Sequence, residues 1–488
     1  MSDEIFHKTI SELRKMLDNH QVSPVELVKI YLNRSKNINP TINSVLTHTE
    51  DLALSSAKLA EKTINNKKSK LLTGIPSMVK DNISTSGIET TAASKILSGY
   101  IPPFDATVIK NLHQDQALIC GKTNLDEFAM GSSTENSAFG SVKNPINTTK
   151  VPGGSSGGSA ASVSAGQCVF ALGSDTGGSI RQPASFCGIT GMKPTYGLVS
   201  RFGLIAFGSS LDQIGPLAKS VKDCAIILNS ISSVDKNDST SIKRPFKDFG
   251  EKIGKSIKGL KIAIPKEYLV NGIEQGVRNA YEKSLIELER GGAILEEITL
   301  PLTDHALSVY YIIAPAEASS NLSRYDGIKY GTSVTGGKNS IEHTFLSRGF
   351  GFGDEVKRRI LLGTYVLSSG YYDAYYLKAQ KVRTLIRNEF NNAFKNFDAI
   401  VTPTTPNVAF NLNEKINDPF QMYLNDVCTI PVNIAGLPAI SVPNGIENNL
   451  PTGLQIIGPR MGDPTVIQIA HYYEEISEWK RKIQNIIK

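Results

Sequence analysis

The sequence contains few cysteines for its length, and they are widely separated. Its 488 residues include only Cys120, Cys168, Cys187, Cys224 and Cys428, and no two of them form a CxxC pair. An odd number at this spacing excludes a disulfide framework and the usual zinc-ligand patterns. Reduced thiols in a cytoplasmic protein are the best interpretation.

Long hydrophobic runs are also absent. No stretch of 18 apolar residues occurs, and no apolar segment near the N-terminus precedes a small-residue cleavage site. These absences argue against a membrane-spanning helix and a secretory signal. We therefore expect a soluble protein that stays in the cytoplasm and has no membrane partner.

Charge of one sign is not in large excess. The chain has 52 Lys and Arg residues against 46 Asp and Glu, which gives a net charge of +6. This charge is small for such a length and argues against an extended nucleic-acid-binding surface. A hydrophobic content of 40% and a charged content of 20% are typical of globular proteins.

The order of apolar and polar segments predicts an α/β fold. Residues 1–35 predict two amphipathic helices, the second beginning at a cap formed by Ser23, Pro24 and Glu26. From about residue 72, short apolar runs alternate with helical stretches, which favours a mostly buried sheet. Strands are expected at 73–80, 117–121, 167–172, 260–265, 399–403 and 439–443, a long helix at 274–290, and a polar surface linker or insertion near 232–259.

Two clusters of glycine and serine are the most unusual feature of the chain. Residues 153–159 read GGSSGGS, and residues 173–181 read GSDTGGSIR. Glycines allow positive φ and close approach of the backbone to a ligand. The second cluster lies between a predicted strand and a predicted helix, so its backbone N–H groups are placed to stabilise a developing oxyanion.

Three kinds of site fit these clusters to different degrees. A phosphate-binding loop is disfavoured because residues 121–123 end like one, yet Gln116 occupies the position of its leading glycine. The pattern G-x-S-x-G around Ser155 or Ser156 suggests a hydrolase elbow, which also needs an acid and a histidine downstream. Three histidines are available, but none lies in a segment that resembles a catalytic loop: His305, His343 and His471.

A serine nucleophile that works without histidine is the third interpretation. It needs another base, and Lys80 ends the apolar run 74–79, at the rim of a predicted buried strand. A lysine acts as a base only where burial or a nearby positive charge keeps its amine neutral.

These motifs together resemble the amidase signature family. The matching segments are 79–82, 153–159 and 173–181, in the family's spacing. The resemblance implies an α/β fold with a large mixed central β-sheet covered by helices on both faces. It also implies a single domain over residues 1–488, with N-terminal helices (1–70) packed on it.

The resemblance also implies a set of catalytic roles. Ser179 is expected to be the nucleophile, Lys80 the base, and Ser155, after a cis peptide bond with Gly154, the proton relay between them. The expected oxyanion donors are the backbone N–H groups of Thr176, Gly177, Gly178 and Ser179. No metal or other cofactor is expected in this chain.

Longer segments resemble the glutamine-hydrolysing branch of the family. These are residues 121–131, 132–140, 200–203, 310–331, 351–359 and 368–376. In that branch Arg359 corresponds to the partner of the glutamine carboxylate, Asp426 to the partner of its ammonium group, and Tyr310 to a further substrate-side residue. Arg358 is the neighbour most easily confused with Arg359.

This branch implies partner subunits. Its members supply ammonia to a B subunit, where ATP and Mg²⁺ support amidation of the glutamyl (or aspartyl) group of a misacylated tRNA, and a small C subunit wraps both. A stand-alone amidase for small carboxamides, a histidine-based hydrolase and a catalytically silent scaffold are the alternatives left open.

Overall fold

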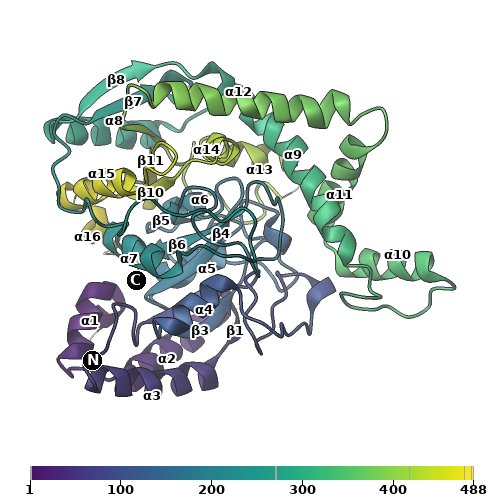
Figure 1. The fold of residues 1–488 in the computed structure, drawn as a ribbon, viewed down its shortest axis with the longest axis horizontal. Coiled ribbons are helices and arrows are strands. Elements are labelled where there is room, and N and C mark those ends of the chain that lie inside the picture. The colour runs from purple at the N-terminus through teal and green to yellow at the C-terminus, as the bar shows by residue number, and fades with distance from the viewer. Residues whose placement is uncertain (1–2, 270–271, 417, 478, 485, 487–488) are drawn as a thin grey trace.

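One continuous β-sheet runs through the middle of the molecule (Figure 1). The computed structural model describes residues 3–269, 272–416, 418–477, 479–484 and 486. Within them the sheet has eleven strands, in the spatial order β1 (Val45–His48), β3 (Leu118–Thr123), β2 (Pro76–Lys80), β4 (Phe170–Asp175), β6 (Gln213–Ala218), β5 (Thr190–Lys193), β10 (Ala439–Glu447), β11 (Leu450–Ile457), β9 (Ala399–Pro403), β7 (Lys261–Pro265) and β8 (Ile294–Ile298).

The sheet is mixed. β2 pairs in parallel with β3 and β4, and β7 pairs in parallel with β8 and β9, whereas the remaining pairs are antiparallel. Each of the six predicted strands is present, displaced by a few residues at most. The predicted α/β class and the large mixed sheet are confirmed.

Helices cover this sheet. The α-helices are α1 (Ile10–Asp18), α2 (Pro24–Ile42), α3 (Glu50–Asn65), α4 (Thr107–Gln114), α5 (Gly157–Ser164), α6 (Arg181–Phe186), α7 (Val221–Ile231), α8 (Gln275–Arg290), α9 (Ala306–Asn321), α10 (Ser340–Gly351), α11 (Asp354–Leu367), α12 (Lys378–Ala393), α13 (Pro419–Tyr423), α14 (Ile430–Ala435), α15 (Asp463–Ile476) and α16 (Trp479–Gln484). Short helical turns are η1 (Asp3–His7), η2 (Lys95–Leu97), η3 (Glu127–Ala129), η4 (Lys266–Leu269), η5 (Pro301–His305), η6 (Leu322–Arg324), η7 (Asp373–Leu377) and η8 (Leu424–Asp426).

The predicted start of the second helix is confirmed in detail. The Ser23 hydroxyl accepts a hydrogen bond from the Glu26 N–H (3.1 Å), and the Glu26 carboxylate accepts one from the Ser23 N–H (2.9 Å). This reciprocal capping box satisfies two N–H groups that have no partner within the helix.

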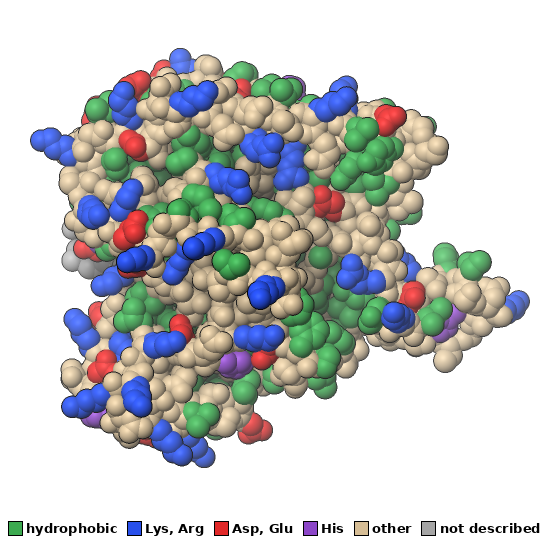
Figure 2. Space-filling model, in the orientation of Figure 1, with side chains coloured by type: hydrophobic (Ala, Val, Ile, Leu, Met, Phe, Trp, Pro, Cys, Tyr) green, Lys and Arg blue, Asp and Glu red, His purple; other side chains and the backbone are tan. Residues whose placement is uncertain are grey.

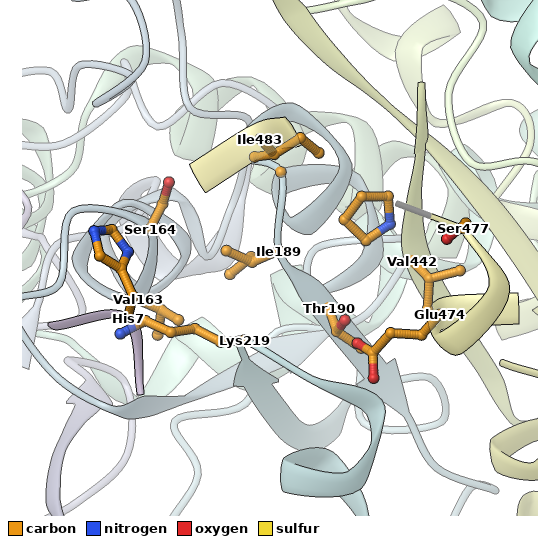
Figure 3. A pocket seen from close by; sticks show the side chains of 12 residues that line it. His7, Val163, Ser164, Ile189, Thr190, Lys219, Val442, Glu474, Ser477 and Ile483 are labelled. Carbon is orange, nitrogen blue, oxygen red and sulfur yellow. The ribbon is translucent and has the colours of Figure 1, made fainter. Parts of the chain in front are cut away.

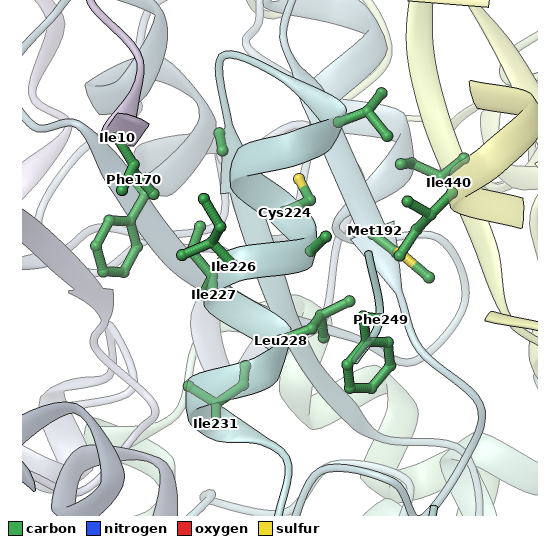
Figure 4. Close-up of a cluster of buried hydrophobic side chains, with 14 of the residues drawn as sticks. Ile10, Phe170, Met192, Cys224, Ile226, Ile227, Leu228, Ile231, Phe249 and Ile440 are labelled. Carbon is green, nitrogen blue, oxygen red and sulfur yellow. The ribbon is translucent and has the colours of Figure 1, made fainter. Parts of the chain in front are cut away.

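Helix α7 lies in the centre of the main hydrophobic core (Figure 4). Its fully buried Cys224, Ile227 and Leu228 belong to the same cluster as Phe170 of β4 and side chains of β5, β10 and α1. The segment predicted as a polar surface linker also contributes Phe249 and Ile257, both fully buried. These contacts tie the N-terminal helices, the middle of the sheet and the 232–259 segment to one core.

Helices α9 to α12 form an arm on one side of the sheet (Figure 1). No helix was predicted in this region from the sequence pattern. Within the arm, α9 and α11 pack tightly because Gly363 of α11 lies against the backbone of α9, where a Cβ would overlap the Pro315 carbonyl oxygen. No helix in the described part of the chain is both long and apolar enough to cross a membrane.

We predict that Gly363→Ala destabilises the arm. An added methyl group forces α9 and α11 apart, and such overpacking costs about 1–3 kcal/mol. Gly349→Ala is the matched control, because Gly349 lies in helix α10 and a Cβ added there would have no neighbouring atom within 4 Å. Alanine at this position should stabilise the helix by up to about 1 kcal/mol through its higher helix propensity. Urea unfolding monitored by circular dichroism measures the free energy of unfolding of both variants. Equal stability of the two variants would contradict the proposed close packing.

Candidate active site

The predicted catalytic residues meet at one edge of the sheet, the edge formed by the carboxyl ends of the neighbouring strands β2 and β4. Lys80 is the last residue of β2, and Ser174 lies near the end of β4. The two strands are parallel neighbours, with Val79 opposite Leu172, so their carboxyl ends lie side by side. Ser155 lies just before α5, and Ser179 lies in the turn between β4 and α6.

The Lys80 amine is completely buried among serine oxygens. Its Nζ lies 2.8 Å from the Oγ atoms of both Ser155 and Ser156, 3.0 Å from Ser174 Oγ and 3.4 Å from the Ser174 carbonyl oxygen. Burial lowers the pKa of Lys80 to about 7, although buried carboxylates nearby oppose the shift. The amine therefore loses its proton near neutral pH, as a general base requires.

The loop that carries Ser155 is fixed on both sides. The Gly154–Ser155 peptide bond is cis, as the resemblance implied. The Gly154 N–H donates to the Gln182 side chain (2.8 Å), and the Ser155 carbonyl accepts from the Asp126 N–H (3.3 Å). The Ser156 N–H donates to the Ser179 carbonyl (3.2 Å), so the two serine loops are in direct contact.

A buried ion pair shapes the turn that carries Ser179. The Asp175 carboxylate accepts hydrogen bonds from Arg181 Nε and Nη2, both at 3.1 Å, and from the N–H groups of Gly178 (2.9 Å) and Ile180 (3.2 Å). Burial opposes ionisation, but the Arg181 guanidinium lowers the pKa of Asp175 to about 2. The carboxylate thus stays charged and holds the backbone on both sides of Ser179.

This turn leaves some backbone donors unoccupied. The Gly178 N–H is already bound to Asp175, which differs from its expected role as an oxyanion donor. Among the described residues, none accepts a hydrogen bond from the N–H groups of Thr176, Gly177 or Ser179. The Tyr310 ring packs on Gly177, where a Cβ would lie only 2.8 Å from the ring, and glycine is therefore required for this contact.

Arg359 of α11 is buried beside aromatic rings. Its guanidinium lies 5.3–5.5 Å from the ring centroids of Phe207, Tyr311 and Tyr423, and its Nε donates to the Glu355 carboxylate at 2.8 Å. No described residue accepts a hydrogen bond from its terminal nitrogens Nη1 and Nη2. These two donors are therefore free to bind a carboxylate in a bidentate manner.

Asp426 presents a complementary acceptor. The Ser132 hydroxyl donates to Asp426 Oδ2, whereas Oδ1 is buried and has no hydrogen-bond partner among the described residues. Burial raises the pKa of Asp426 to about 7, and the Arg359 charge counteracts the shift. A buried acceptor without a partner is costly unless a ligand supplies a donor.

Two cavities differ in their suitability for a substrate. One of about 540 Å³ is lined by Glu127, Glu135, Arg358, Arg359 and Tyr423 among others, which is large enough for an amino acid. The other, of about 30 Å³ (Figure 3), contains none of the predicted site residues. This volume is far below the roughly 300–1,000 Å³ typical of ligand pockets, so this cavity is a poor candidate for the substrate site.

Several residues that hold the site together were not predicted from the sequence. Asp126, Asp175, Arg181 and Gln182 are all buried. The side chains of Asp175 and Gln182 accept from backbone N–H groups of the serine loops, the Asp126 N–H donates to the Ser155 carbonyl, and Arg181 pairs with Asp175. Each lies within or beside one of the motifs, but spacing along the chain carries no signal about which backbone group a side chain contacts. The described residues contain no group of three or more His, Cys, Asp or Glu side chains suited to a metal ion.

Comparison with known proteins assigns the family. The family model described as Amidase matches residues 26–467. The chain belongs to the amidase family. It is 54% identical over 483 residues to the A subunit of glutamyl-tRNA(Gln) amidotransferase from Thermoanaerobacter pseudethanolicus, covering 99% of each chain.

Solved structures of amidase-family proteins have the same fold. The A subunit of glutamyl-tRNA(Gln) amidotransferase from Thermotoga maritima superposes with a TM-score of 0.81 at 47% identity, covering 96% of this chain and 95% of that one. The peptide amidase from Stenotrophomonas maltophilia superposes with a TM-score of 0.82 at 28% identity, covering 96% and 97%. Proteins with different substrates in their names thus share this amidase fold.

Proposed function

We propose that this chain is the glutamine-hydrolysing subunit of a tRNA-dependent amidotransferase, with the activity of a glutaminyl-tRNA synthase (glutamine-hydrolysing). The observation that carries the proposal is the buried amine of Lys80, hydrogen-bonded to Ser155 and located at the same sheet edge as Ser179. The full-length similarity to the glutamyl-tRNA(Gln) amidotransferase relatives supports this choice among amidases.

The proposed reaction proceeds through an acyl-enzyme. Ser179 Oγ attacks the side-chain carbonyl carbon of glutamine, its proton passes to Ser155, and the Ser155 proton passes to neutral Lys80. Donors of the turn stabilise the tetrahedral oxyanion, in this structure the N–H groups of Thr176, Gly177 and Ser179, while Gly178 stays bound to Asp175. The C–N bond then breaks, and the returned proton leaves with ammonia. Water hydrolyses the ester to glutamate by the same proton path.

The charged ends of glutamine match two side chains of the site. Arg359 has two free terminal nitrogens for the α-carboxylate, and Asp426 Oδ1 has a free lone pair for the α-ammonium group. Tyr310 contributes a hydroxyl next to Gly177, and burial raises the pKa of Tyr310, so the hydroxyl remains a donor.

In this proposal the ammonia is used by other subunits. A B subunit holds ATP, Mg²⁺ and the misacylated tRNA, Glu-tRNA(Gln) or Asp-tRNA(Asn), and a C subunit completes the heterotrimer. The arm supports such an assembly because it exposes large apolar side chains, including Ile341 (82% exposed), Phe345 (74%) and Leu361 (71%). Figure 2 shows hydrophobic side chains gathered where α11 connects to α12. Clusters of this kind are typical of protein interfaces.

The proposal is tested by glutamine hydrolysis with and without partners. We expect co-expressed B and C subunits to co-purify with the chain, and misacylated tRNA to stimulate ammonia release from glutamine. Ser179→Ala should lower kcat by at least about 10³-fold, since it removes the nucleophile. Ser230→Ala, a change of serine on helix α7 outside the site, is the control. Strong hydrolysis of simple carboxamides by the chain alone, with no partner binding, would indicate a stand-alone amidase instead.

The pH dependence of glutamine hydrolysis should show an acidic limb near pH 7. Only the neutral Lys80 amine accepts a proton, and burial sets the pKa of Lys80 to about 7; kcat/KM therefore falls as the pH drops below 7. Ionised Asp426, whose pKa burial raises to about 7, is also required, so the limb should have a slope above one. Asp426→Asn should reduce that slope to about one. A profile that is flat from pH 5 to 8 would exclude Lys80 as the base.

Arg359→Met should weaken glutamine binding selectively. Loss of a charge-assisted contact costs roughly 1.5–3 kcal/mol per hydrogen bond, and a bidentate contact has two, so KM for glutamine should rise by at least about 100-fold. Arg358→Met is the matched control, because Arg358 is half-exposed and pairs with Glu355 at the surface. Steady-state kinetics of both variants show which of the two arginines binds the glutamine carboxylate. A larger effect at Arg358 would reverse the assignment.

A further inference from the structure

The adjacent residues Asp126 and Glu127 bind two different parts of the molecule. The Asp126 carboxylate accepts from the N–H groups of Thr134 (2.9 Å) and Asn136 (3.1 Å), and it packs on Gly154, where a Cβ would overlap it. Glu127, only 3% exposed, binds the arm instead. One dipeptide thus contacts both the Ser155 loop and the beginning of α11.

Glu127 caps helix α11 from a distant segment. Its Oε2 accepts a hydrogen bond from the N–H of Gly353 (2.8 Å), the N-cap residue of α11, which has no side chain to cap the helix itself. A Cβ on Gly353 would overlap Glu127 Oε2. A carboxylate at this position is favourable because helix N-termini carry unpaired N–H groups and a partial positive charge.

Further contacts hold the same turn against the arm. The Ser94 hydroxyl donates to Glu127 Oε1 and lies 3.1 Å from the Gly351 carbonyl oxygen. The next residue, Phe128, packs edge-on against Phe352 at a centroid distance of 5.7 Å, with φ of 50°, a left-handed conformation uncommon for a bulky residue. The turn is therefore fixed by its contacts with the start of α11.

The position of α11 determines the position of Arg359. Arg359 lies less than two helical turns after Gly353, roughly 9 Å along the axis at 1.5 Å per residue. A small rotation or shift at the N-terminus of the helix therefore displaces the guanidinium. Glu127 and Arg359 also line the same cavity.

We propose that Glu127 is a positioning residue that anchors the N-terminus of α11 to the Ser155 loop and thereby places Arg359 for the substrate carboxylate. This inference deepens the proposed function and rests on it. The Glu127 carboxylate is hydrogen-bonded to Ser94 and Gly353, and not to Lys80, Ser155 or Ser179. It acts through Arg359, so it controls binding of the charged substrate rather than the chemical step.

The kinetic test uses the chain assembled with its partners. Glu127→Ala is expected to raise KM for glutamine tenfold or more while kcat stays within twofold, the pattern of lost substrate binding. Glu127→Gln should restore KM to within threefold, because its carbonyl oxygen accepts from Gly353 and its amide group donates to Ser94. In an Arg359→Met background, Glu127→Ala should raise KM less than twofold further, since coupled residues are not additive.

A second measurement does not depend on glutamine hydrolysis. Hydrogen–deuterium exchange of the full-length chain should be at least tenfold faster for the amides of residues 353–357 in Glu127→Ala but not in Glu127→Gln. Glu135→Ala is the matched control: its carboxylate lines the same cavity but binds the Asn413 N–H, and exchange of α11 should not change.

The outcomes separate this inference from the proposed function. Absence of glutaminase activity in the wild-type protein would refute the proposed function. The hydrogen–deuterium exchange result would still report on the contact between Glu127 and the N-terminus of α11. Unchanged exchange in Glu127→Ala, a fall in kcat with unchanged KM, a Gln variant as impaired as the Ala variant, or full additivity with Arg359→Met would each overturn the role of Glu127.

Discussion

The active site depends on the burial of one lysine amine among neutral oxygen acceptors. A buried ammonium group in contact with a carboxylate keeps its proton, whereas one surrounded by hydroxyls loses it more easily. Lys80 has the second environment, with serine oxygens as its hydrogen-bond partners. The nearby carboxylates are bound elsewhere, Asp175 to Arg181 and Asp126 to backbone N–H groups. The ion pair and the backbone contacts therefore help to keep the lysine usable as a base.

The same crowding around Lys80 explains why glycines occur in the two serine loops. Two chain segments must lie close enough to Lys80 for their serines to reach its amine, and the space between them is filled by backbone and carboxylate groups. A Cβ on Gly154 would overlap Asp126, and a Cβ on Gly178 would overlap Thr429. Packing thus requires glycine at both positions, and at Gly178 the φ of 137° favours glycine as well.

The residues at the carboxyl ends of the strands could be predicted from the sequence more fully than the residues of the arm could. Lys80, Ser155 and Ser179 occur in compact motifs next to strongly apolar strands, so their neighbourhood could be inferred from local pattern and family spacing. Tyr310, Arg359 and Asp426 come from α9, α11 and η8, three separate segments. Their contacts depend on long-range packing, such as that of Gly363 on α9, which periodicity does not encode. The resemblance predicts a substrate-binding role for these three residues, but it carries no information about the unpartnered Oδ1 of Asp426 or the contact between Glu127 and Gly353.

In the proposed function, the chemical step and substrate recognition use different parts of the structure. The proposed proton path lies at the carboxyl ends of β2 and β4, where burial lowers the pKa of Lys80 to about 7. The predicted recognition residues lie on or beside the arm, whose helix α9 packs in a second hydrophobic core with Ala263, Ile400 and Ile457 of the sheet. Asp426 of η8, beside the arm, is joined to the serine loops through Ser132: the Ser132 hydroxyl donates to Asp426, and its carbonyl accepts from Gln182, whose side chain also holds Gly154. Two of these contacts, Gln182 with Ser132 and Gly154 with Gln182, involve backbone groups, and the third joins the side chains of Ser132 and Asp426. Leu361, part of the exposed apolar surface of the arm, lies on the same helix as Arg359, whereas Lys80 and its serine partners lie on or beside β2, β4 and α5. In the proposed assembly, a partner on that surface is therefore joined by a single helix to a proposed recognition residue, and not to the proposed base.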